Sequence, residues 1–302
     1  MEGIRIGIDL GGTKIEAVAL AANGAILARQ RFDSPRDDYL RTLEAIEHAI
    51  AVIEARIGAR GTIGIGTPGA LSRVTGRLRN SNSTWLNGKP IRDDLERRLG
   101  RPVRIENDAN CFALSEAIDG AGSGSRVVIG IILGTGTGSG IVVDRQLLTG
   151  ANAIAGEWGH NPLPWAAAED LPAPPCWCGQ AGCIETYLSG PGMARDHLAA
   201  TDARLTAADI AARAATGDPS ALATVDRYVA RLARALAHVI NLVDPDAIVL
   251  GGGLSNIAAV YSRVPLQWGR HVFSDHVSTR LLPNVHGDAS GVRGAAWLWN
   301  TP

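Results

Sequence analysis

The chain has 302 residues, a formal net charge of -1 and 46% hydrophobic residues. Its length suits about two domains, and its hydrophobic content is enough to fill large cores. The near-zero net charge argues against a basic surface of the kind that nucleic acids or anionic membranes attract. Because the first residues show no signal peptide and no apolar run is long enough to span a bilayer, we expect a cytoplasmic protein.

The first predicted element is a β-hairpin with a glycine-rich turn. Residues 4–9 alternate Ile with Arg and Gly, the turn reads D-L-G-G-T-K over 9–14, and a second apolar run follows over 16–20. Backbone N–H groups at such a turn can converge on phosphate oxygens, Thr13 adds a donor, and Asp9 offers a site for a metal-bound water. Taken alone the signal is weak, because a glycine-rich turn is most often only a turn.

A helix is predicted next, over residues 39–56, from apolar residues at helical spacing, namely Leu40, Leu43, Ile46, Ile50 and Ile53. A short strand over 62–66 ends in T-P-G, residues 67–69. The polar segment 80–90 surrounds Trp85, which suits a sugar contact as well as it suits an anchor in the core.

An acidic motif follows a third short strand. Residues 103–105 lead into E-N-D-A-N, 106–110, and then into an alanine-rich helix that runs to about residue 118. Asp108 therefore lies at or near a helix N-terminus, where an acid is stabilised in any case. On this motif alone the structural role outweighs a catalytic one, and only the phosphate turns shift the balance.

Residues 127–140 echo the opening of the chain. I-G-I-D-L-G-G-T at 6–13 corresponds to I-G-I-I-L-G-T-G at 129–136, and a second apolar strand follows each. Two copies of a strand–glycine turn–strand unit indicate a duplicated two-domain protein with nucleotide between the copies. A dinucleotide-binding G-x-G-x-x-G motif is disfavoured, because Ser139 replaces the third glycine and the turn leads to a strand. The sequence contains no Walker A motif either.

Residues 157–185 contain three of the four cysteines and organise the rest of the chain. Three thiolates and one imidazole form a known tetrahedral zinc set, here His160, Cys176, Cys178 and Cys183. A disulfide with a spare thiol is the weaker alternative, because adjacent turns strain such a bridge and nothing indicates export. With all four positions filled the zinc would be structural, and its expected role is to hold Glu157 and Glu185 near each other.

The longest helix is predicted from Asp218 to about residue 243, with one apolar face made of Leu222, Val225, Val229, Leu232, Leu236, Val239 and Ile240. A buried strand over 247–250 then runs into three glycines, 251–253, a turn that can admit a flat base against bare backbone. The chain closes on a helix that we expect Trp297 and Trp299 to pack.

Along essentially the whole chain, these motifs resemble the ROK group (repressors, open reading frames and kinases) of the actin-like ATPase superfamily. The matched motifs are D-L-G-G-T-K, E-N-D-A-N, L-G-T-G-T-G, E-W-G-H, C-W-C-G-Q-A-G-C-I-E and L-G-G-G, in that order. The resemblance implies an α/β, two-domain actin-like ATPase (ribonuclease H-like) fold with a central cleft and a structural zinc loop at 157–185. We expect an N-terminal domain over 1–120 and a larger C-terminal domain over 121–289, with a last helix over about 290–302 that packs back on the first.

The resemblance also implies a role for each matched residue. The general base would be Asp108. The sugar would be bound by Gly69, Asn82, Asn107, Asp108, Glu157, His160 and Glu185. ATP with Mg²⁺ would be bound by Asp9, Gly11, Gly12, Thr13, Lys14, Gly134, Thr135, Gly136, Thr137, Gly138, Gly252 and Gly253. The structural Zn²⁺ would be bound by His160, Cys176, Cys178 and Cys183.

Two features receive no role from the resemblance. The Ala/Pro-rich spacer 166–175 departs from the family in composition, and either a lid or an exposed loop would suit it. Cys111 has no metal partner in the sequence, so we expect an inert buried thiol.

Within the group the chain is most similar to bacterial fructokinases of the manno(fructo)kinase kind. The segments N-S-T-W-L-N-G, E-W-G-H-N-P-L-P-W and S-G-V-R-G-A-A-W-L-W carry this likeness. The resemblance implies an ATP-dependent fructokinase that forms fructose 6-phosphate, and we expect a homodimer that binds neither nucleic acid nor membrane. Glucokinase, mannokinase and N-acetylhexosamine kinase stay open, because a few pocket contacts decide the sugar.

Two alternatives belong to other classes of protein. A sugar-sensing regulator without catalysis would carry an N-terminal helix-turn-helix, and the first strand starts at Ile4, where we expect no room for one. A non-catalytic sugar-binding module stabilised by zinc would leave the nucleotide turns and Asp108 without a purpose. We therefore expect an enzyme.

Overall fold

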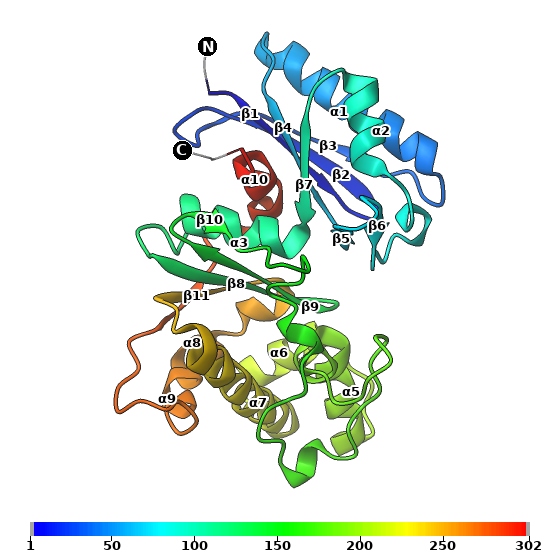
Figure 1. Ribbon diagram of the computed structural model, residues 1–302. Coiled ribbons are helices and arrows are strands. Elements are labelled where there is room, and N and C mark those ends of the chain that lie inside the picture. Colours follow the sequence, from blue (N-terminus) through cyan, green and yellow to red (C-terminus); the bar gives the residue numbers. More distant parts are fainter. Residues whose placement is uncertain (1–2, 300–302) are drawn as a thin grey trace. The chain divides into compact units, whose positions relative to one another are not determined.

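The computed structural model describes residues 3–299, and the chain divides into two compact units, parts of which are labelled in Figure 1. Unit 1 combines the chain up to Gly124 with Gly140–Ala155 and the chain from Val285 onward, and unit 2 combines Ser125–Ser139 with Gly156–Asn284. The domain limits drawn from the sequence stay a prediction, and they differ from this division in placing residues 121–124, 140–155 and 285–289 with the second domain. Among the described residues, no helix has the length and apolar character needed to cross a membrane.

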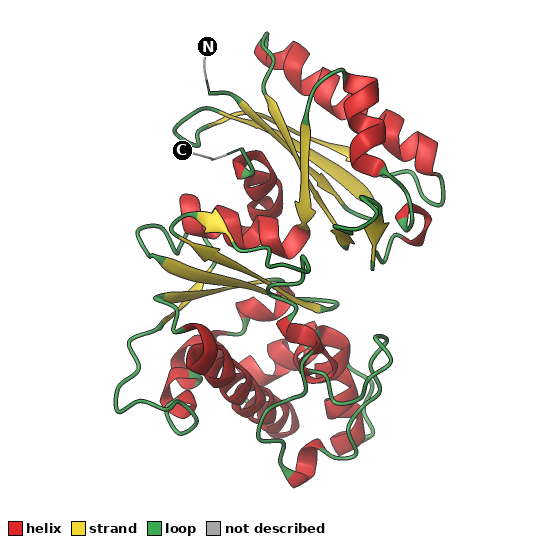
Figure 2. Ribbon diagram, viewed as in Figure 1, coloured by secondary structure: helices red, strands yellow, loops and turns green. Residues whose placement is uncertain are grey.

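Unit 1 is built on a five-stranded sheet, and strands are yellow in Figure 2. The strand order is β3-β2-β1-β4-β7, with the labels of Figure 1. Its strands are β1 (Arg5–Leu10), β2 (Lys14–Leu20), β3 (Ile26–Asp33), β4 (Thr62–Thr67) and β7 (Val103–Asn107). The predicted hairpin is confirmed, because β1 and β2 pair antiparallel from Arg5↔Leu20 to Leu10↔Ile15. β1, β4 and β7 run parallel, so the segments that follow all three strands leave from the same edge of the sheet.

Helices lie on both faces of this sheet. Ile6 and Ile8 of β1 belong to the core shared with α1 (Tyr39–Ile57) and α2 (Ile91–Leu99). α1 begins after Asp38, whose side chain accepts a hydrogen bond from the Arg41 amide, and its predicted face is buried except for Leu40. Leu40 is 62% exposed and lies in the first turn of α1, where the buried face of the helix has not yet begun.

The opposite face of the sheet receives α10 (Ser290–Trp297) and α3 (Asp108–Ile118). Gly7 of β1 and Gly64 of β4 make this possible, because a Cβ on either would overlap a backbone carbonyl of α10. Trp297 is buried as expected, and the Trp299 indole donates to Ile63 O over 2.6 Å. The predicted last helix ends at Trp297 in the structure, and residues 300–302 lie outside the described part of the chain.

A small sheet of β5 (Ala70–Leu71) and β6 (Leu78–Arg79) precedes the polar segment that contains Trp85. Trp85 lies in a short 3-10 helix, Thr84–Leu86, and packs against the core of unit 1. Its indole donates to Thr42 Oγ1 of α1 over 3.2 Å. Of the two interpretations of this tryptophan, the contacts favour the core anchor.

The second five-stranded sheet has the order β10-β9-β8-β11-β12. Its strands are β8 (Val127–Leu133), β9 (Thr137–Val143), β10 (Gln146–Leu147), β11 (Ala247–Gly251) and β12 (Arg280–Pro283). β8, β11 and β12 run parallel, as β1, β4 and β7 do. The repeat seen in the sequence therefore reappears as one strand order used twice.

The helices of unit 2 are α4 (Ile184–Leu188), α5 (Gly190–Thr201), α6 (Ala207–Ala215), α7 (Pro219–Val243), α8 (Ala258–Arg263) and α9 (Pro265–Trp268). α7 confirms the longest predicted helix and begins at Asp218, whose side chain accepts from the Ala221 amide. Its predicted apolar face is buried except for Leu222, which is 39% exposed because the first turn extends past the core.

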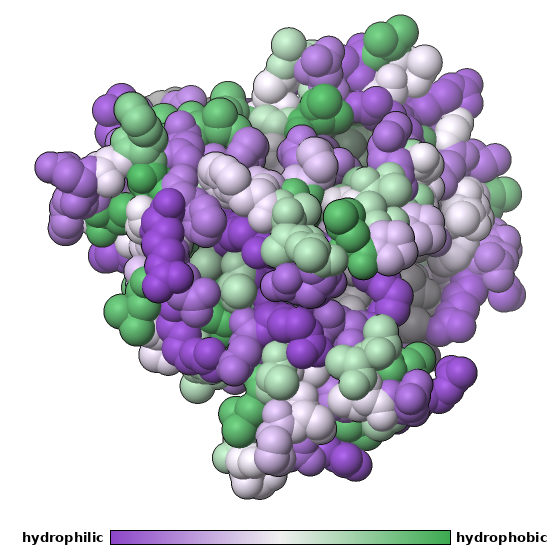
Figure 3. Space-filling model, turned by 90° about the horizontal axis from the view of Figure 1, so that it is seen from below, coloured by the Kyte–Doolittle hydropathy of each residue, from purple (hydrophilic) through white to green (hydrophobic). Residues whose placement is uncertain are grey.

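The face of the molecule drawn in Figure 3 mixes hydrophilic and hydrophobic residues without one continuous hydrophobic area.

Candidate functional site

The first glycine turn of unit 1 joins β1 to β2. The Gly11 amide donates to Lys14 O over 3.0 Å, which closes the turn. Thr13 and Lys14 are exposed, and Gly12 is partly buried. The turn therefore presents a hydroxyl and an ammonium group at the end of the hairpin, as a phosphate-binding turn requires.

Asp9 is the last but one residue of β1 and is partly buried behind this turn. A Cβ added to Gly291 would lie 3.3 Å from Asp9 Oδ2, so α10 approaches this carboxyl group closely. Burial, followed by the charges of Asp108 and Glu16, raises the pKa of Asp9 to about 7. The charge of Lys14 offsets this rise only in part, and a divalent cation with oxygen ligands would supply further positive charge to an ionised Asp9.

Asp108 is the first residue of α3, which confirms its predicted place at a helix N-terminus. Its Oδ1 accepts a hydrogen bond from the Ala109 amide over 2.9 Å. Because α3 is buried from Ala109 to Ile118, the carboxyl group is mounted on a rigid element rather than on a loop.

Asn107 is the N-cap of α3, and both ends of its side-chain amide are engaged. Its Oδ1 accepts from the Ala109 amide over 2.9 Å, and its Nδ2 donates to Gly69 O over 3.1 Å. Gly69 has a φ of +82°, and a Cβ there would overlap Arg79 O, so only glycine suits this turn. Asn82 lies exposed in the loop after β6. Asn107 thus ties together two of the segments predicted to bind sugar.

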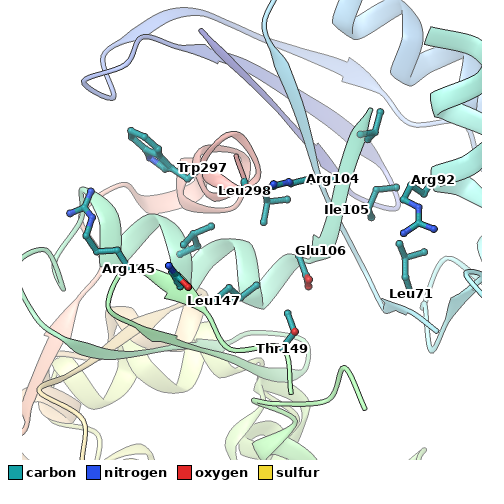
Figure 4. Close-up of a pocket in the computed structure, with 13 residues that line it drawn as sticks. Leu71, Arg92, Arg104, Ile105, Glu106, Arg145, Leu147, Thr149, Trp297 and Leu298 are labelled. Carbon is teal, nitrogen blue, oxygen red and sulfur yellow. Dashed lines mark hydrogen bonds between the residues drawn. The ribbon is translucent and has the colours of Figure 1, made fainter. Parts of the chain in front are cut away.

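Glu106 is a residue of this site that sequence reasoning missed. Its Oε2 accepts from Asn110 Nδ2 over 3.0 Å and from the Asn107 amide over 3.3 Å, and burial raises its pKa. Glu106 supports the turn from β7 into α3. Its place four residues before Asn110 is the feature of the sequence from which this contact could have been predicted. Glu106 also lines a cavity of about 370 Å³ in unit 1, shown in Figure 4. That cavity lies along β7 and α10 and does not include Asp9 or Asp108 among its lining residues.

The second glycine turn belongs to unit 2 and joins β8 to β9. The Gly134 amide donates to Gly136 O over 2.9 Å, and Thr135 is exposed at the tip. Gly138 follows within β9. The Thr137 hydroxyl is buried and has no hydrogen-bond partner among residues 3–299. The buried hydroxyls of Ser34 and Ser115 are likewise without a partner in the described part of the chain, so this feature alone does not mark a ligand site.

The third glycine turn follows β11 and meets the second. Gly252 has a φ of +80°, and a Cβ there would lie 2.5 Å from Leu133 O at the end of β8. Gly253 begins the next short 3-10 helix and faces open space. Since β8 and β11 are parallel neighbours, the two turns lie at the same edge of one sheet, where α/β folds bind nucleotides.

The predicted zinc ligands converge in unit 2. One ligand atom from each of His160, Cys176, Cys178 and Cys183 lies within 4.8 Å of the others. Cys176 Sγ is 3.6 Å from His160 Nδ1, and Cys178 Sγ is 3.6 Å from Cys183 Sγ. Zinc bonds of about 2.0–2.3 Å in a tetrahedron place neighbouring ligand atoms roughly 3.5–3.8 Å apart, so the residues fit a zinc ion. All four cysteines are free thiols.

Cys178 and Cys183 of the cluster differ in the direction of their pKa shifts. Burial raises the pKa of Cys183 to about 12, while a backbone N–H of Gln180 lowers the pKa of the exposed Cys178. Three thiolates close together would repel one another, and a bound divalent metal is the usual compensation. Positive φ angles at Gly179 and Gly182 allow the tight turns between the ligands.

Thr137 brings the two acidic motifs of the cysteine loop together. Gly159, in the 3-10 helix Trp158–His160, packs so closely on Thr137 O that a Cβ would overlap it. On its other side, the Thr137 amide donates to Glu185 Oε2 over 2.8 Å. Glu157 immediately precedes the same 3-10 helix and is exposed. The segments that carry Glu157 and Glu185 therefore both contact the start of β9.

The Ala/Pro-rich spacer, residues 166–175, is held against α7. Neither of the two roles expected for it, a lid or an exposed loop, predicts such an attachment. Asp170 is 3% exposed, and its two carboxylate oxygens accept from Arg231 Nε over 2.7 Å and from Arg234 Nη2 over 2.6 Å. Tyr187 donates its hydroxyl to Asp170 O over 2.8 Å. The sequence does contain a signal for this attachment. Asp170 is an acid within an apolar run, and Arg231 and Arg234 lie three residues apart on α7. Cys111 is fully buried, as expected.

Comparisons with known proteins agree with this architecture. A family model described as the ROK family matches residues 5–302. The N-acetyl-D-glucosamine kinase of Salmonella paratyphi C is 42% identical over 296 residues, which cover 97% of this chain and 98% of that protein.

Two solved structures extend the comparison. The ROK hexokinase from Thermus thermophilus has a TM-score of 0.86 and 32% identity, covering 97% of this chain and 96% of its own. The ROK family glucokinase from Streptomyces griseus, in complex with glucose and AMPPNP, has a TM-score of 0.77 and 30% identity, covering 98% and 99%.

Proposed function

Because the chain belongs to the ROK family and is an ATP-dependent sugar kinase of that family, we propose that its acceptor is N-acetyl-D-glucosamine. The observation that carries this proposal is the 42% identity to an N-acetyl-D-glucosamine kinase over 97% of the chain. Glucose is the second candidate, because a ROK glucokinase is 30% identical over 98% of the chain.

Fructose, the sugar expected from three short segments, is less well supported than the N-acetylhexosamine alternative. Two of those segments contain Trp85 and Trp297, which pack against or within the core of unit 1. Similar residues at such positions preserve packing and say little about which hydroxyl groups a pocket accepts. The likeness to fructokinases in these two segments is therefore a likeness of the core.

Asp108 is proposed as the general base, which accepts the proton of the attacking 6-hydroxyl while the oxygen attacks the γ-phosphorus of ATP. Its mounting on buried α3 supports this role, because a base must be held within hydrogen-bond reach of its proton. Asn107 keeps one amide hydrogen and one lone pair beyond its two hydrogen bonds, so a sugar contact is compatible with its capping role.

Asp9 is proposed to hold the Mg²⁺ that accompanies ATP, directly or through water. When bound, the ion neutralises charge on the phosphates during transfer. The turn from Gly11 to Lys14 would donate backbone and side-chain groups to phosphate oxygens. The raised pKa of Asp9 supports the proposal, because it marks a carboxyl group that stays charged at neutral pH only beside positive charge.

In unit 2, Glu157 and Glu185 are proposed to accept hydrogen bonds from sugar hydroxyl groups. The glycine turns at residues 134–136 and 251–253, with the partnerless Thr137 hydroxyl, are proposed to bind the nucleotide. The cysteine cluster would hold a zinc ion with all positions filled, so the metal would order the loop and take no part in phosphoryl transfer.

A coupled assay of ADP release tests the proposal with N-acetyl-D-glucosamine, glucose, mannose and fructose as acceptors. We expect kcat/KM to be highest for N-acetyl-D-glucosamine and ADP release to be negligible without sugar. A higher kcat/KM for fructose would restore the fructokinase assignment. Sugar binding in calorimetry without any ADP release would instead favour a regulator.

A further inference from the structure

Trp177 lies between two of the zinc-ligand cysteines and is held out in solvent. Its side chain is 69% exposed, yet its indole Nε1 donates to Glu185 Oε1 over 2.7 Å. The ring also meets the His160 imidazole edge to face, with centroids 4.9 Å apart and planes at 88°. A large exposed aromatic side chain with two specific contacts is placed by those contacts, because it is not buried in a core.

The second oxygen of Glu185 is held as firmly as the first. Glu185 Oε2 accepts from the Thr137 amide over 2.8 Å, and a Cβ added to Gly136 would lie 2.7 Å from it. The terminal torsion of a glutamate is otherwise soft. Two donors on opposite oxygens therefore fix the plane of this carboxylate.

The Glu185 carboxylate can still accept further hydrogen bonds. Each oxygen carries two lone pairs, and the indole and the amide occupy one on each oxygen. Glu185 is partly exposed, so its remaining lone pairs can face a ligand. Their directions are set by Trp177 and Thr137 before the ligand arrives, which lowers the cost of ordering on binding.

We propose that Trp177 is a positioning residue for the sugar: its indole N–H orients Glu185 so that the free lone pairs meet sugar hydroxyl groups. The inference rests on the proposed function, in which Glu185 is a sugar ligand. It goes beyond that function because it gives a role to Trp177, which acts through its indole N–H group on the Glu185 carboxylate. The ring itself is not required to touch the sugar.

The matched variants are Trp177→Phe and Trp165→Phe. Trp177→Phe keeps an aromatic ring beside His160 and removes only the donor. Trp165 is also exposed, at 50%, and its ring lies against His271 with centroids 4.9 Å apart, so Trp165→Phe controls for loss of a surface indole in the same unit. Zinc content of each purified variant shows whether the cysteine loop is intact.

The measurements are the sugar Kd by calorimetry without nucleotide and the steady-state constants with N-acetyl-D-glucosamine. We expect Trp177→Phe to raise the sugar Kd and KM by roughly 3–30-fold, the range for an exposed hydrogen bond to a charged group. Turnover and the KM for ATP should change less than about twofold. The reason is that the lost contact stabilises bound sugar equally in the ground state and in the transition state. Trp165→Phe should behave as the wild type.

A double-mutant cycle with Glu185→Ala decides whether Trp177 acts through Glu185. If it does, Trp177→Phe in the Glu185→Ala background should change the sugar Kd by less than about twofold. Independent, multiplicative effects would overturn the inference, as would an unchanged sugar Kd in a zinc-loaded Trp177→Phe protein. Those results would leave the proposed function standing, whereas a wild-type protein that binds none of the four sugars would remove both.

Discussion

The backbone amide of Thr137 donates a hydrogen bond to Glu185 Oε2 over 2.8 Å. Thr137 belongs to the second glycine turn, proposed to bind nucleotide, and Glu185 follows Cys183, the last of the proposed zinc ligands, by two residues. One hydrogen bond thus links the proposed nucleotide turn to the proposed sugar ligand. Loss of the whole cysteine loop should therefore disturb both the proposed sugar ligand and the start of β9, whereas the loss of one side-chain donor in the loop should affect the sugar alone.

Asp108→Asn should leave the fold intact and lower turnover by roughly 10²–10⁴-fold, the usual contribution of a general base. The fold should survive because asparagine is an equally good acceptor at the start of α3. Asp93→Asn, at an exposed acid in the first turn of α2, is the control and should retain full turnover. Near-normal turnover in the Asp108 variant would exclude it as the base.

Asp9→Asn should abolish activity yet stabilise the metal-free protein at neutral pH. The pKa of Asp9 is raised to about 7, so between about pH 4 and 7 the folded state binds more protons than the unfolded state. The stability of the wild type therefore falls as pH rises through this window, and the neutral amide avoids that loss. Thermal unfolding in EDTA should show a gain in Tm of about 2–4 °C or more at pH 8, shrinking toward pH 4. A difference in Tm that does not vary with pH would contradict the raised pKa.

Asp170→Asn should destabilise unit 2 by about 2–5 kcal/mol. The substitution leaves the buried guanidinium groups of Arg231 and Arg234 without the carboxylate that pairs with both. The neighbouring Glu169 is exposed in the same short 3-10 helix, so Glu169→Gln is a matched control and should change stability little. Urea unfolding of both variants gives the comparison, and equal stabilities would show that the spacer is not anchored through Asp170.

Removal of zinc should abolish sugar phosphorylation while most of the core stays folded. Elemental analysis should find about one zinc ion per chain, as four ligands for one tetrahedral ion require. Cys178→Ser should lose the metal and the activity, although we assign Cys178 no contact with either substrate. Cys111→Ala, at the cysteine outside the cluster, should retain the metal. Full kinase activity in a zinc-free preparation would refute the structural role of the metal.

Several elements of this protein could be predicted from the sequence alone. The first hairpin, the helix that starts at Asp108 and α7 are confirmed. The four side chains predicted to bind zinc do lie together, and their metal stays a prediction. Each is encoded by spacing within a short window, because secondary structure and tight metal loops depend on residues a few positions apart. Leu40 and Leu222 fit the same helical patterns and are exposed, since periodicity marks a face and does not show where the core ends.

The tertiary structure alone decided how the site is braced. Glu185 meets Thr137 across 48 positions of sequence, and Asp170 meets Arg231 across 61. Trp177 is exposed and its indole donates to Glu185, and neither property follows from its place between two cysteines. These contacts depend on where separately folded strands, turns and helices come to rest against one another. The two partners of each contact are too far apart in the sequence to fall within one periodic pattern. Only the packing of the folded chain brings them together.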